Sequence, residues 1–225
     1  MTVAAILTAA GSGLRLGHPE PKALVRLNGT PLLQHAARRL VMSGSIDTLV
    51  VTAPAGHEVA FRALVPEAVV VTGGSTRQAS VAAGLAVLPS ATERVLVHDA
   101  ARPLASPELI RRVLDALLAG HRAVVPGVPL VDTVTRVDPT ATGATAALGT
   151  VPRDGLRGVQ TPQGFDRALL DAAHAAGVDT LATDDAGLVE ALGIPVWLVP
   201  GEESALKITT PRDLALAELL LQEAR

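Results

Sequence analysis

The 225-residue sequence contains no cysteine and no tyrosine, and its only aromatic residues are two phenylalanines and one tryptophan. The absence of cysteine excludes disulfides, thiolate metal sites and a cysteine nucleophile. So few aromatic side chains leave almost nothing to stack on the bases of a single strand, and a net charge of −3 gives no sign of nucleic-acid binding. We therefore expect an aliphatic core and no nucleic-acid partner.

Long hydrophobic runs are also missing. No apolar stretch approaches the length of a membrane span, and the N-terminus lacks the basic segment that opens a signal peptide. We therefore expect a cytoplasmic protein with no membrane partner. A hydrophobic content of 48% and a charged content of 18% are typical of a compact globular protein. No repeat or linker divides the chain, so we expect a single domain over residues 1–225.

Lysine is scarce as well. Of the 19 basic residues only Lys22 and Lys207 are lysines, so arginine serves almost everywhere that a surface cation is needed. A compact ammonium differs from a planar guanidinium in phosphate chemistry, which makes both lysines candidates for a functional site. The competing explanation is that these lysines survive on the surface by chance. This explanation competes more strongly for Lys207 than for Lys22.

What the chain does have is a loop of small residues near its N-terminus. The apolar run 3–7 predicts a buried strand of a parallel sheet. The next residues, 9–13, have small side chains or none, with the sequence Ala-Ala-Gly-Ser-Gly. The backbone N–H groups of such a loop can approach an anion closely, and Arg15 and Lys22 follow in the same segment. This arrangement indicates a polyphosphate site.

The loop matches neither of the two familiar glycine motifs. A P-loop needs Ser or Thr after its lysine, but Ala23 follows Lys22. The dinucleotide fingerprint is Gly-x-Gly-x-x-Gly, and here the third glycine, Gly17, comes one residue too late. That motif also needs an acidic residue about 20 positions on to hold the ribose, and none lies between Glu20 and Asp47. A strand-to-helix turn without any ligand explains the loop equally well when it is taken alone.

The rest of the chain alternates strand and helix patterns, which predicts an α/β, Rossmann-like fold: an open, mostly parallel twisted sheet with helices on both faces. Thr30 is predicted to cap a helix that begins at Pro31 and stops at Gly44. The expected strands are 3–7, 49–51, 68–71, 94–99, 123–126 and 196–199. The other expected helices are 58–65, one that opens from the loop 72–80 and runs to 88, a capped one from Ser106-Pro107 to about 120, 166–176, one that follows 183–185 and runs to 192, and a final one that follows 206–211 and ends near 222.

Two further segments are predicted at the carboxyl edge of this sheet, where parallel sheets bind ligands. Residues 72–80 form a second small-residue loop, in which Ser75 or Thr76 can equally be a helix start. Asp99 ends a strand at the same edge and suits Mg²⁺, which takes one or two carboxylates with phosphate oxygens. Capping of the next turn is the alternative for Asp99, and His98 is predicted to be a core histidine on the opposite face.

The pattern breaks between residues 131 and 155. Val131 to Val137 alternates weakly, and residues 138–150 are rich in Thr, Ala and Gly. This stretch cannot be a packed strand–helix–strand unit. It predicts an extended hairpin or arm leaving the domain, or an irregular loop.

Taken together, these motifs resemble the 2-C-methyl-D-erythritol 4-phosphate cytidylyltransferase family of the non-mevalonate isoprenoid pathway. The first loop alone indicates only the wider group of nucleotidyltransferases. Ala23 departs from the family, in which many members carry Gln, and the chain does not resemble longer members that continue into a cyclodiphosphate synthase. The matching motifs keep the family's order over nearly the whole chain and are residues 9–15, 21–22, 73–80, 97–103, 132–133, 153, 160–163, 183–185 and 207–209.

The resemblance implies an enzyme that transfers CMP from CTP to methylerythritol phosphate and releases pyrophosphate. Arg15 and Lys22 would bind the triphosphate and the developing charge, and Lys207 would bear on the reacting phosphates from the far side. Asp99 would hold Mg²⁺ or another divalent ion. No protein nucleophile is required, so catalysis would consist of positioning and charge stabilisation.

The resemblance also implies the binding residues. The nucleotide would be bound by Ala9, Ala10, Gly11, Gly13, Gly73, Gly74, Ser80 and Asp99. The acceptor, methylerythritol phosphate, would be bound by Arg102, Thr133, Arg153, Thr161 and Thr183.

The resemblance further implies a homodimer in which the arm, about residues 131–155, crosses to the partner and delivers Thr133 and Arg153 in trans. Two other functions remain open. A cytidylyltransferase for another polyol phosphate, such as ribitol 5-phosphate, would share the nucleotide half of the site. A non-catalytic nucleotide-binding module would explain the glycine loops, but not the joint presence of Lys22, Asp99 and Lys207.

Overall fold

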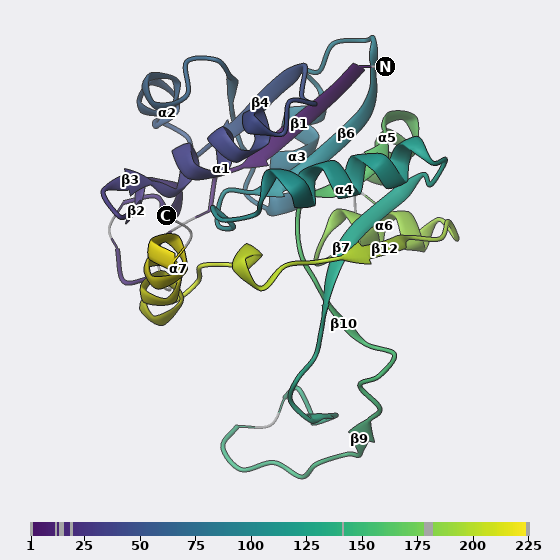
Figure 1. The fold of residues 1–225 in the computed structure, drawn as a ribbon. Helices are drawn as coiled ribbons and strands as arrows, with labels where there is room; N and C mark the ends of the chain where they lie inside the picture. Colours follow the sequence, from purple (N-terminus) through teal and green to yellow (C-terminus); the bar gives the residue numbers. More distant parts are fainter. Residues whose placement is uncertain are drawn as a thin grey trace.

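The computed structural model describes residues 2–11, 13, 16–18, 20–140, 142–177 and 182–223. Within these ranges the chain forms one mixed sheet with the strand order β10-β7-β11-β6-β1-β4-β5, and β12 pairs with β7. Helices cover both faces, and one long hairpin projects away from the sheet (Figure 1). The strands are β1 (Thr2–Thr8), β4 (Thr48–Ala53), β5 (Val69–Thr72), β6 (Thr92–Asp99), β7 (Ala123–Pro129), β10 (Arg157–Val159), β11 (Gln163–Asp166) and β12 (Trp197–Pro200).

The sheet is parallel through its centre. β1 pairs in parallel with β4 and β6, and β4 pairs in parallel with β5. β11 runs antiparallel to β6 and β7, which makes the sheet mixed on that side. The carboxyl ends of β1 and β6 therefore lie next to each other, with Thr8 in register with Asp99.

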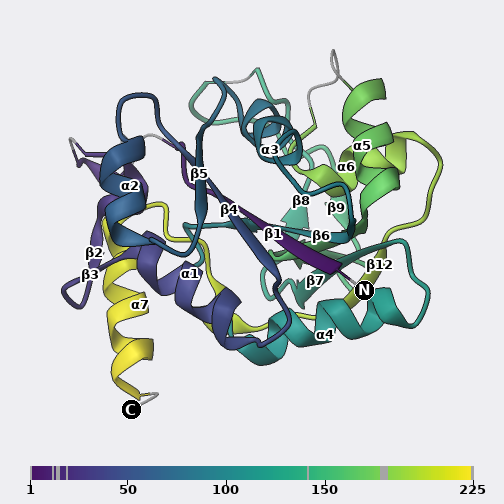
Figure 2. The ribbon, with the colours of Figure 1, turned by 90° about the horizontal axis from the view of Figure 1, so that it is seen from above.

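Alternating side chains of the strands fill two apolar layers. Val3, Ala5 and Leu7 of β1 point to one face, whereas Ala4 and Ile6 point to the other. Figure 2 shows α1 and α4 on the first face and α3, α5 and α6 on the second. The predicted aliphatic α/β core is confirmed. The helices are α1 (Leu32–Met42), α2 (Glu58–Leu64), α3 (Arg77–Leu85), α4 (Pro107–Leu118), α5 (Arg167–Ala176), α6 (Asp185–Ala191) and α7 (Pro211–Glu223), with short 3₁₀ turns η2 (Lys22–Leu24) and η3 (Glu203–Ala205).

Side-chain caps begin four of these helices. The side chains of Thr76, Ser106, Asp166 and Asp184 each accept a hydrogen bond from a backbone N–H in the first turn of α3, α4, α5 and α6. The capped start at Ser106 is the predicted one, and Thr76 is one of the two expected helix starts of its loop. A short polar side chain before a helix satisfies one of its unpaired donors, so Asp166, which was expected to be the first residue of its helix, caps it instead. No helix within the described ranges is both long and apolar enough to cross a membrane.

The predicted cap at Thr30 is wrong. Thr30–Pro31 form strand β3, which pairs antiparallel with β2 (Arg26–Leu27) across the two-residue Asn28-Gly29 turn. α1 begins at Leu32 without a side-chain cap. The Asn-Gly turn is a strong hairpin signal, and it takes Thr30 into a strand pair before the helix starts.

The segment 131–155 is the projecting arm of Figure 1, as the sequence predicted. Its ends are tied by β8 (Val134–Thr135) and β9 (Thr150–Val151), which pair antiparallel. None of its described residues is buried, and Val131 is 81% exposed. The arm therefore takes no part in the core of its own chain.

Candidate active site

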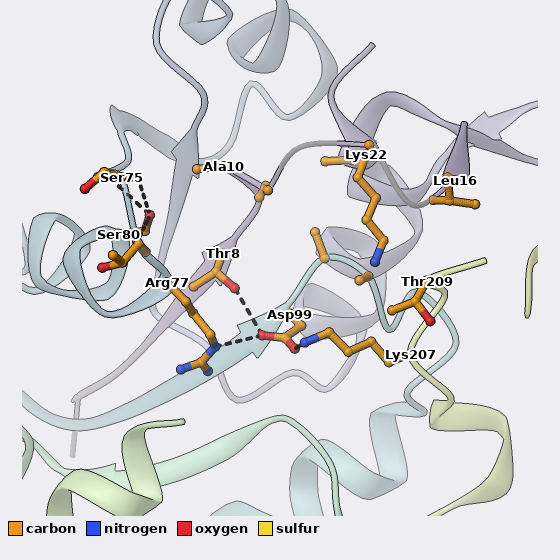
Figure 3. A pocket seen from close by; sticks show the side chains of 18 residues that line it. Thr8, Ala10, Leu16, Lys22, Ser75, Arg77, Ser80, Asp99, Lys207 and Thr209 are labelled. Carbon is orange, nitrogen blue, oxygen red and sulfur yellow. Dashed lines mark hydrogen bonds and ion pairs between the residues drawn. The ribbon is translucent and has the colours of Figure 1, made fainter. Parts of the chain in front are cut away.

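A cavity with a volume of about 640 Å³ lies at the carboxyl ends of β1 and β6. Figure 3 shows side chains from four separate segments converging on it. It is lined by Thr8, Ala9, Ala10, Gly11, Gly13, Leu16, Lys22, Ala23, Gly74, Ser75, Thr76, Arg77, Ser80, Asp99, Ala100, Ala101, Lys207 and Thr209. The sheet edge that was predicted to bind a ligand is thus hollow.

The first loop forms one wall. Gly13 is buried, and a Cβ placed there would lie 2.7 Å from the backbone oxygen of Glu20, so no larger residue fits without a backbone shift. The N–H of Lys22 donates to the carbonyl of Gly11 at 3.3 Å, which closes the loop, and the Lys22 side chain reaches into the cavity (Figure 3). Arg15, the second cation predicted in this loop, lies outside the described residues.

The second loop approaches the first one closely at Gly73. A Cβ on Gly73 would lie 2.6 Å from Cβ of Ala10 and 2.9 Å from Oγ of Ser80, so only glycine fits. The Ser80 hydroxyl accepts from the N–H of Gly74 at 3.1 Å and donates to the carbonyl of Thr76 at 2.9 Å. Ser80 therefore holds this loop together as well as lining the cavity, and Gly73 lies behind the lining.

Asp99 is the centre of the site. Its residue is 6% exposed, and its Oδ1 accepts from Nε of Arg77 at 3.2 Å and from Oγ1 of Thr8 at 3.2 Å. Its Oδ2 lies 2.7 Å from Nζ of Lys207. Burial alone would raise the pKa of Asp99, but the cations Arg77 and Lys207 outweigh burial and hold the pKa well below its usual range. Asp99 is therefore ionised across the pH range in which an enzyme works.

Lys207 is positioned by the segment that leads to it. Arg102 donates through Nη1 to the carbonyl of Ala205 at 2.7 Å, and the side-chain amide of Gln160 makes two hydrogen bonds to the backbone of Glu202. The N–H of Ile208, which is fully buried, donates to the carbonyl of Ala101. The Lys207 ammonium is thus delivered to Asp99 by a backbone that is held on both sides of η3.

A second cavity of about 240 Å³ lies beyond Asp99. It shares three charged residues with the first cavity, namely Arg77, Asp99 and Lys207. The two spaces therefore adjoin along a wall of two cations and one anion. The other residues around the smaller cavity are Arg102, Val159, Gln160, Thr161, Gln163, Thr183 and Asp184.

A buried chain of hydrogen bonds through His98 and Thr161 leads to the backbone N–H of Asp99. His98 is 1% exposed, and burial lowers its pKa from 6.5 to about 4, so the ring is neutral at pH 7. Its Nε2 faces the carbonyl of Arg102 at 3.2 Å, which can only accept, and its Nδ1 lies 2.8 Å from Oγ1 of Thr161. We therefore assign the ring proton to Nε2, so that the Thr161 hydroxyl donates to Nδ1 and accepts from the N–H of Asp99 at 3.1 Å. His98 is the satisfied core histidine that was predicted.

The predicted metal ligand is a single carboxylate. No group of three or more metal-binding side chains occurs in the described part of the chain. One carboxylate beside a phosphate cavity fits Mg²⁺, which commonly takes one or two carboxylates and completes its shell with substrate phosphates and water. Asp99 fits that role, although a cation at Oδ2 would have to share the position with the Lys207 ammonium.

Two predicted acceptor residues lie outside both cavities. Thr133 and Arg153 are exposed on the arm, and neither lines a cavity. Arg153 donates through Nη1 to the carbonyl of Val131, also on the arm. By contrast, Arg102, Thr161 and Thr183 do gather around the smaller cavity. Within one chain, therefore, the acceptor residues fall into two separate groups.

Similarity to known proteins identifies the family. The sequence model of the 2-C-methyl-D-erythritol 4-phosphate cytidylyltransferases matches residues 3–223. The chain belongs to this family. The cytidylyltransferase of Rhodococcus opacus is 51% identical over 222 residues, which cover 98% of this chain and 96% of the relative.

Solved structures of this family have the same fold as this chain. The crystal structure of the cytidylyltransferase from Thermus thermophilus is 41% identical, with a TM-score of 0.80 over 99% of this chain and 100% of that one. The 4-diphosphocytidyl-2C-methyl-D-erythritol synthase structure from Anaerococcus prevotii has a TM-score of 0.84 at 31% identity, covering 98% of each chain. The fold predicted from the sequence is thus that of known members of the cytidylyltransferase family.

The structure adds residues that the sequence did not single out for the site. Thr8 donates to Asp99, and Arg77 joins Asp99 to Asp185. Arg77 stood in a recognised motif but had no assigned role. For Asp185 the sequence contains one signal, which is that it directly follows another aspartate. Asp184 caps α6, so a cap does not account for the second carboxylate.

Proposed function

We propose that this chain transfers a cytidylyl group from CTP to 2-C-methyl-D-erythritol 4-phosphate. The observation that carries the proposal is the pair of adjoining cavities, because their shared wall of Arg77, Asp99 and Lys207 is a place where two phosphates can react. A volume of about 640 Å³ is within the range of small-molecule sites, which suits a nucleoside triphosphate. The smaller cavity would take the acceptor phosphate.

In this reaction an acceptor phosphate oxygen attacks the α-phosphorus of CTP in line. A new P–O bond forms, the bond from the α-phosphorus to the bridging oxygen breaks, and pyrophosphate leaves with the electron pair. Lys22 lines the larger cavity, and Lys207 lines both cavities, so its ammonium would lie between the two phosphates. Both ammonium groups are aimed at charge that develops as the bonds change, which is how a site without a nucleophile accelerates transfer.

We further propose Mg²⁺ as the cofactor, with Asp99 as its protein ligand. When bound, the ion would neutralise part of the charge on the phosphates. The roles inferred from the family for Arg15 and for the nucleotide contacts of Gly11, Gly73 and Ser80 stay predictions. A cytoplasmic location likewise stays a prediction.

We also propose a homodimer in which the arm supplies Thr133 and Arg153 to the other subunit. The support is that both residues lie away from the cavities of their own chain, on a segment without a buried residue among those described. Val131, Val137 and Leu148 expose apolar surface on this arm. A partner subunit would cover that surface and complete the acceptor site.

The proposed activity is tested by measuring pyrophosphate release with CTP, UTP, ATP and GTP, each offered with methylerythritol phosphate and ribitol 5-phosphate. The coupled nucleotide product is identified by mass spectrometry, and each pair is repeated with EDTA. We expect turnover only with CTP, methylerythritol phosphate and a divalent ion. Equal rates with UTP, or with ribitol phosphate, would contradict the proposed substrate pair. CTP binding without turnover on any acceptor would indicate a binding module.

A further inference from the structure

Arg77 does not present a free guanidinium to the cavity. As the first residue of α3, it directs Nε to Oδ1 of Asp99 at 3.2 Å and Nη1 to Oδ2 of Asp185 at 2.6 Å. Its third nitrogen, Nη2, is buried and has no hydrogen-bond partner in the described chain. An arginine that binds a phosphate through two parallel hydrogen bonds needs two available nitrogens on one side. Arg77 is thus built to act on another protein group.

The anchor of Arg77 is a buried carboxylate. Asp185 is 1% exposed at the start of α6, and its Oδ1 lies 2.9 Å from Nε2 of His174 in α5. Burial alone would lower the pKa of Arg77, but Asp185 and Asp99 together raise it, so the guanidinium keeps its charge. A line of contacts thus runs from His174 through Asp185 and Arg77 to Asp99. It links α5, α6 and α3 to the end of β6.

Asp99 needs such an anchor because its other ionic partner is more exposed to solvent. The Lys207 side chain is 41% exposed, and its ammonium lies on Oδ2 at 2.7 Å. Without Arg77, the hydroxyl of Thr8 would be the remaining side-chain contact of Oδ1 among the described residues. The Asp99 carboxylate would then be free to turn toward Lys207 with both oxygens. Holding Oδ1 leaves Oδ2 aimed at the junction of the two cavities.

We propose that Arg77 is a positioning residue for the transfer reaction: held by Asp185, it fixes the Asp99 carboxylate so that Oδ2 faces the reacting phosphates and their cation. This inference rests on the proposed function of the same site. It assigns no direct substrate contact to Arg77. Groups that orient a metal-binding side chain from behind typically contribute 10- to 100-fold to activity or metal affinity.

The test compares Arg77→Lys and Asp185→Asn with the matched control Arg167→Lys. Arg167 also joins α3 to α5, since it donates to the carbonyl of Leu85 and pairs with Asp171, but it lies outside both cavities. One lysine ammonium cannot make both of the contacts of Arg77, and the amide introduced by Asp185→Asn would lack the charge that holds the guanidinium. We expect kcat to fall, and the Mg²⁺ concentration for half-maximal rate to rise, by roughly 10- to 100-fold in both site variants and not in the control.

A binding measurement separates positioning from catalysis. Calorimetry with CTP is performed on the wild type and on the same variants, once with Mg²⁺ and once with EDTA. We expect the variants to bind CTP less tightly than the wild type in Mg²⁺ and equally well in EDTA, because Arg77 acts through the carboxylate. Equal losses in both conditions would show that Arg77 contacts the nucleotide directly, and would overturn the inference.

A double variant separates positioning from stability. Removing one member of a buried ion pair is strongly destabilising, whereas removing both charges can be nearly neutral. In Arg77→Met with Asp185→Asn we expect the melting temperature to recover towards the wild type while kcat stays low. Recovery of both would mean that the pair serves only the fold.

The outcomes also separate this inference from the proposed function. An active wild type whose site variants keep the normal kcat and Mg²⁺ dependence would overturn the role of Arg77 alone. A wild type that neither binds CTP nor turns it over would overturn the proposed function.

Discussion

The end of β6 and the arm of residues 131–155 are built in opposite ways. At the end of β6, Asp99 is buried, its carboxylate touches two cations and a hydroxyl, and its N–H is bound by Thr161. In the arm no described residue is buried, and the hydrogen bond that Arg153 donates stays within the arm itself. The first region is ordered before any ligand arrives, and the second has little in its own chain to order it.

Substitutions in the two regions should therefore have different effects. A preorganised charge can stabilise a transition state because no reorganisation is needed at the moment of reaction. A side chain on an unsupported arm must first be ordered, at an entropic cost, so it contributes poorly unless another surface holds it. Substitutions near β6 should therefore change the rate or the stability, and substitutions on the arm should change acceptor binding.

The largest effect is expected at Lys22. Lys22→Ala should lower kcat by on the order of 10²-fold or more, because the substitution removes a charge aimed at the transition state. The melting temperature should change little, since the side chain lines a cavity rather than the core. The measurement is steady-state kinetics with thermal unfolding, and Arg26→Ala is the matched control because Arg26 is an exposed cation nearby on β2. A folded and fully active Lys22→Ala would show that Lys22 is an ordinary surface cation.

A smaller effect is expected at His98, on the free energy of unfolding and not on the rate. The pKa of His98 is about 4 in the folded chain, below its unfolded value of 6.5. As the pH falls below 6.5 the unfolded state binds a proton first, so the stability from neutral His98 is present above 6.5 and is lost towards pH 4. The free energy of unfolding should therefore be lower by roughly 2 kcal/mol at pH 5 than at pH 7 from this group alone.

The control for this prediction is a variant of an exposed histidine. Chemical unfolding of wild type, His98→Gln and His18→Gln is measured at pH 7 and pH 5. We expect His98→Gln to lose less stability than the wild type between the two pH values, and His18→Gln to lose as much as the wild type. The same loss in all three proteins would show that His98 does not resist protonation.

Local features were predictable from the sequence, because their causes are local. The cap Ser106 follows from a short polar side chain just ahead of an apolar helical pattern, and the strand ending at Asp99 follows from its apolar run. Thr30 misled the interpretation because a helix cap and a hairpin strand compete for the same residues. There the Asn-Gly turn decided the outcome.

Long-range features were not predictable in the same way. Arg77 and Asp185 are separated by 108 positions in the chain, and nothing in either local pattern shows that they meet. The three residues shared by the two cavities come from α3, β6 and the segment after η3. Family motifs placed Asp99 and Lys207 at a common site. Only the fold reveals that Arg77 binds one oxygen of the Asp99 carboxylate while Lys207 binds the other.

The smallest effect on catalysis is expected on the arm. Arg153→Ala should raise KM for methylerythritol phosphate by on the order of tenfold, because a hydrogen-bonded contact to a charged group is lost. KM for CTP and kcat should change little, since Arg153 lies outside the larger cavity. Arg136→Ala is the matched control, because Arg136 is also an exposed arginine of the arm.

Whether Arg153 acts across a dimer is decided by mixing two variants at an acceptor concentration far below the raised KM. Arg153→Ala and Lys22→Ala are each weak under that condition, but a mixed dimer would contain one site with Lys22 and the partner's arginine both intact. Random, symmetric exchange makes half of the dimers mixed, so the mixture should recover up to about a quarter of the wild-type activity per subunit. Exchange is verified by native mass spectrometry of differently tagged subunits. Recovery would mean that the arm of one subunit completes the site of the other. Verified exchange without recovery, or a fully active monomer, would mean that the arm serves its own chain or no site at all.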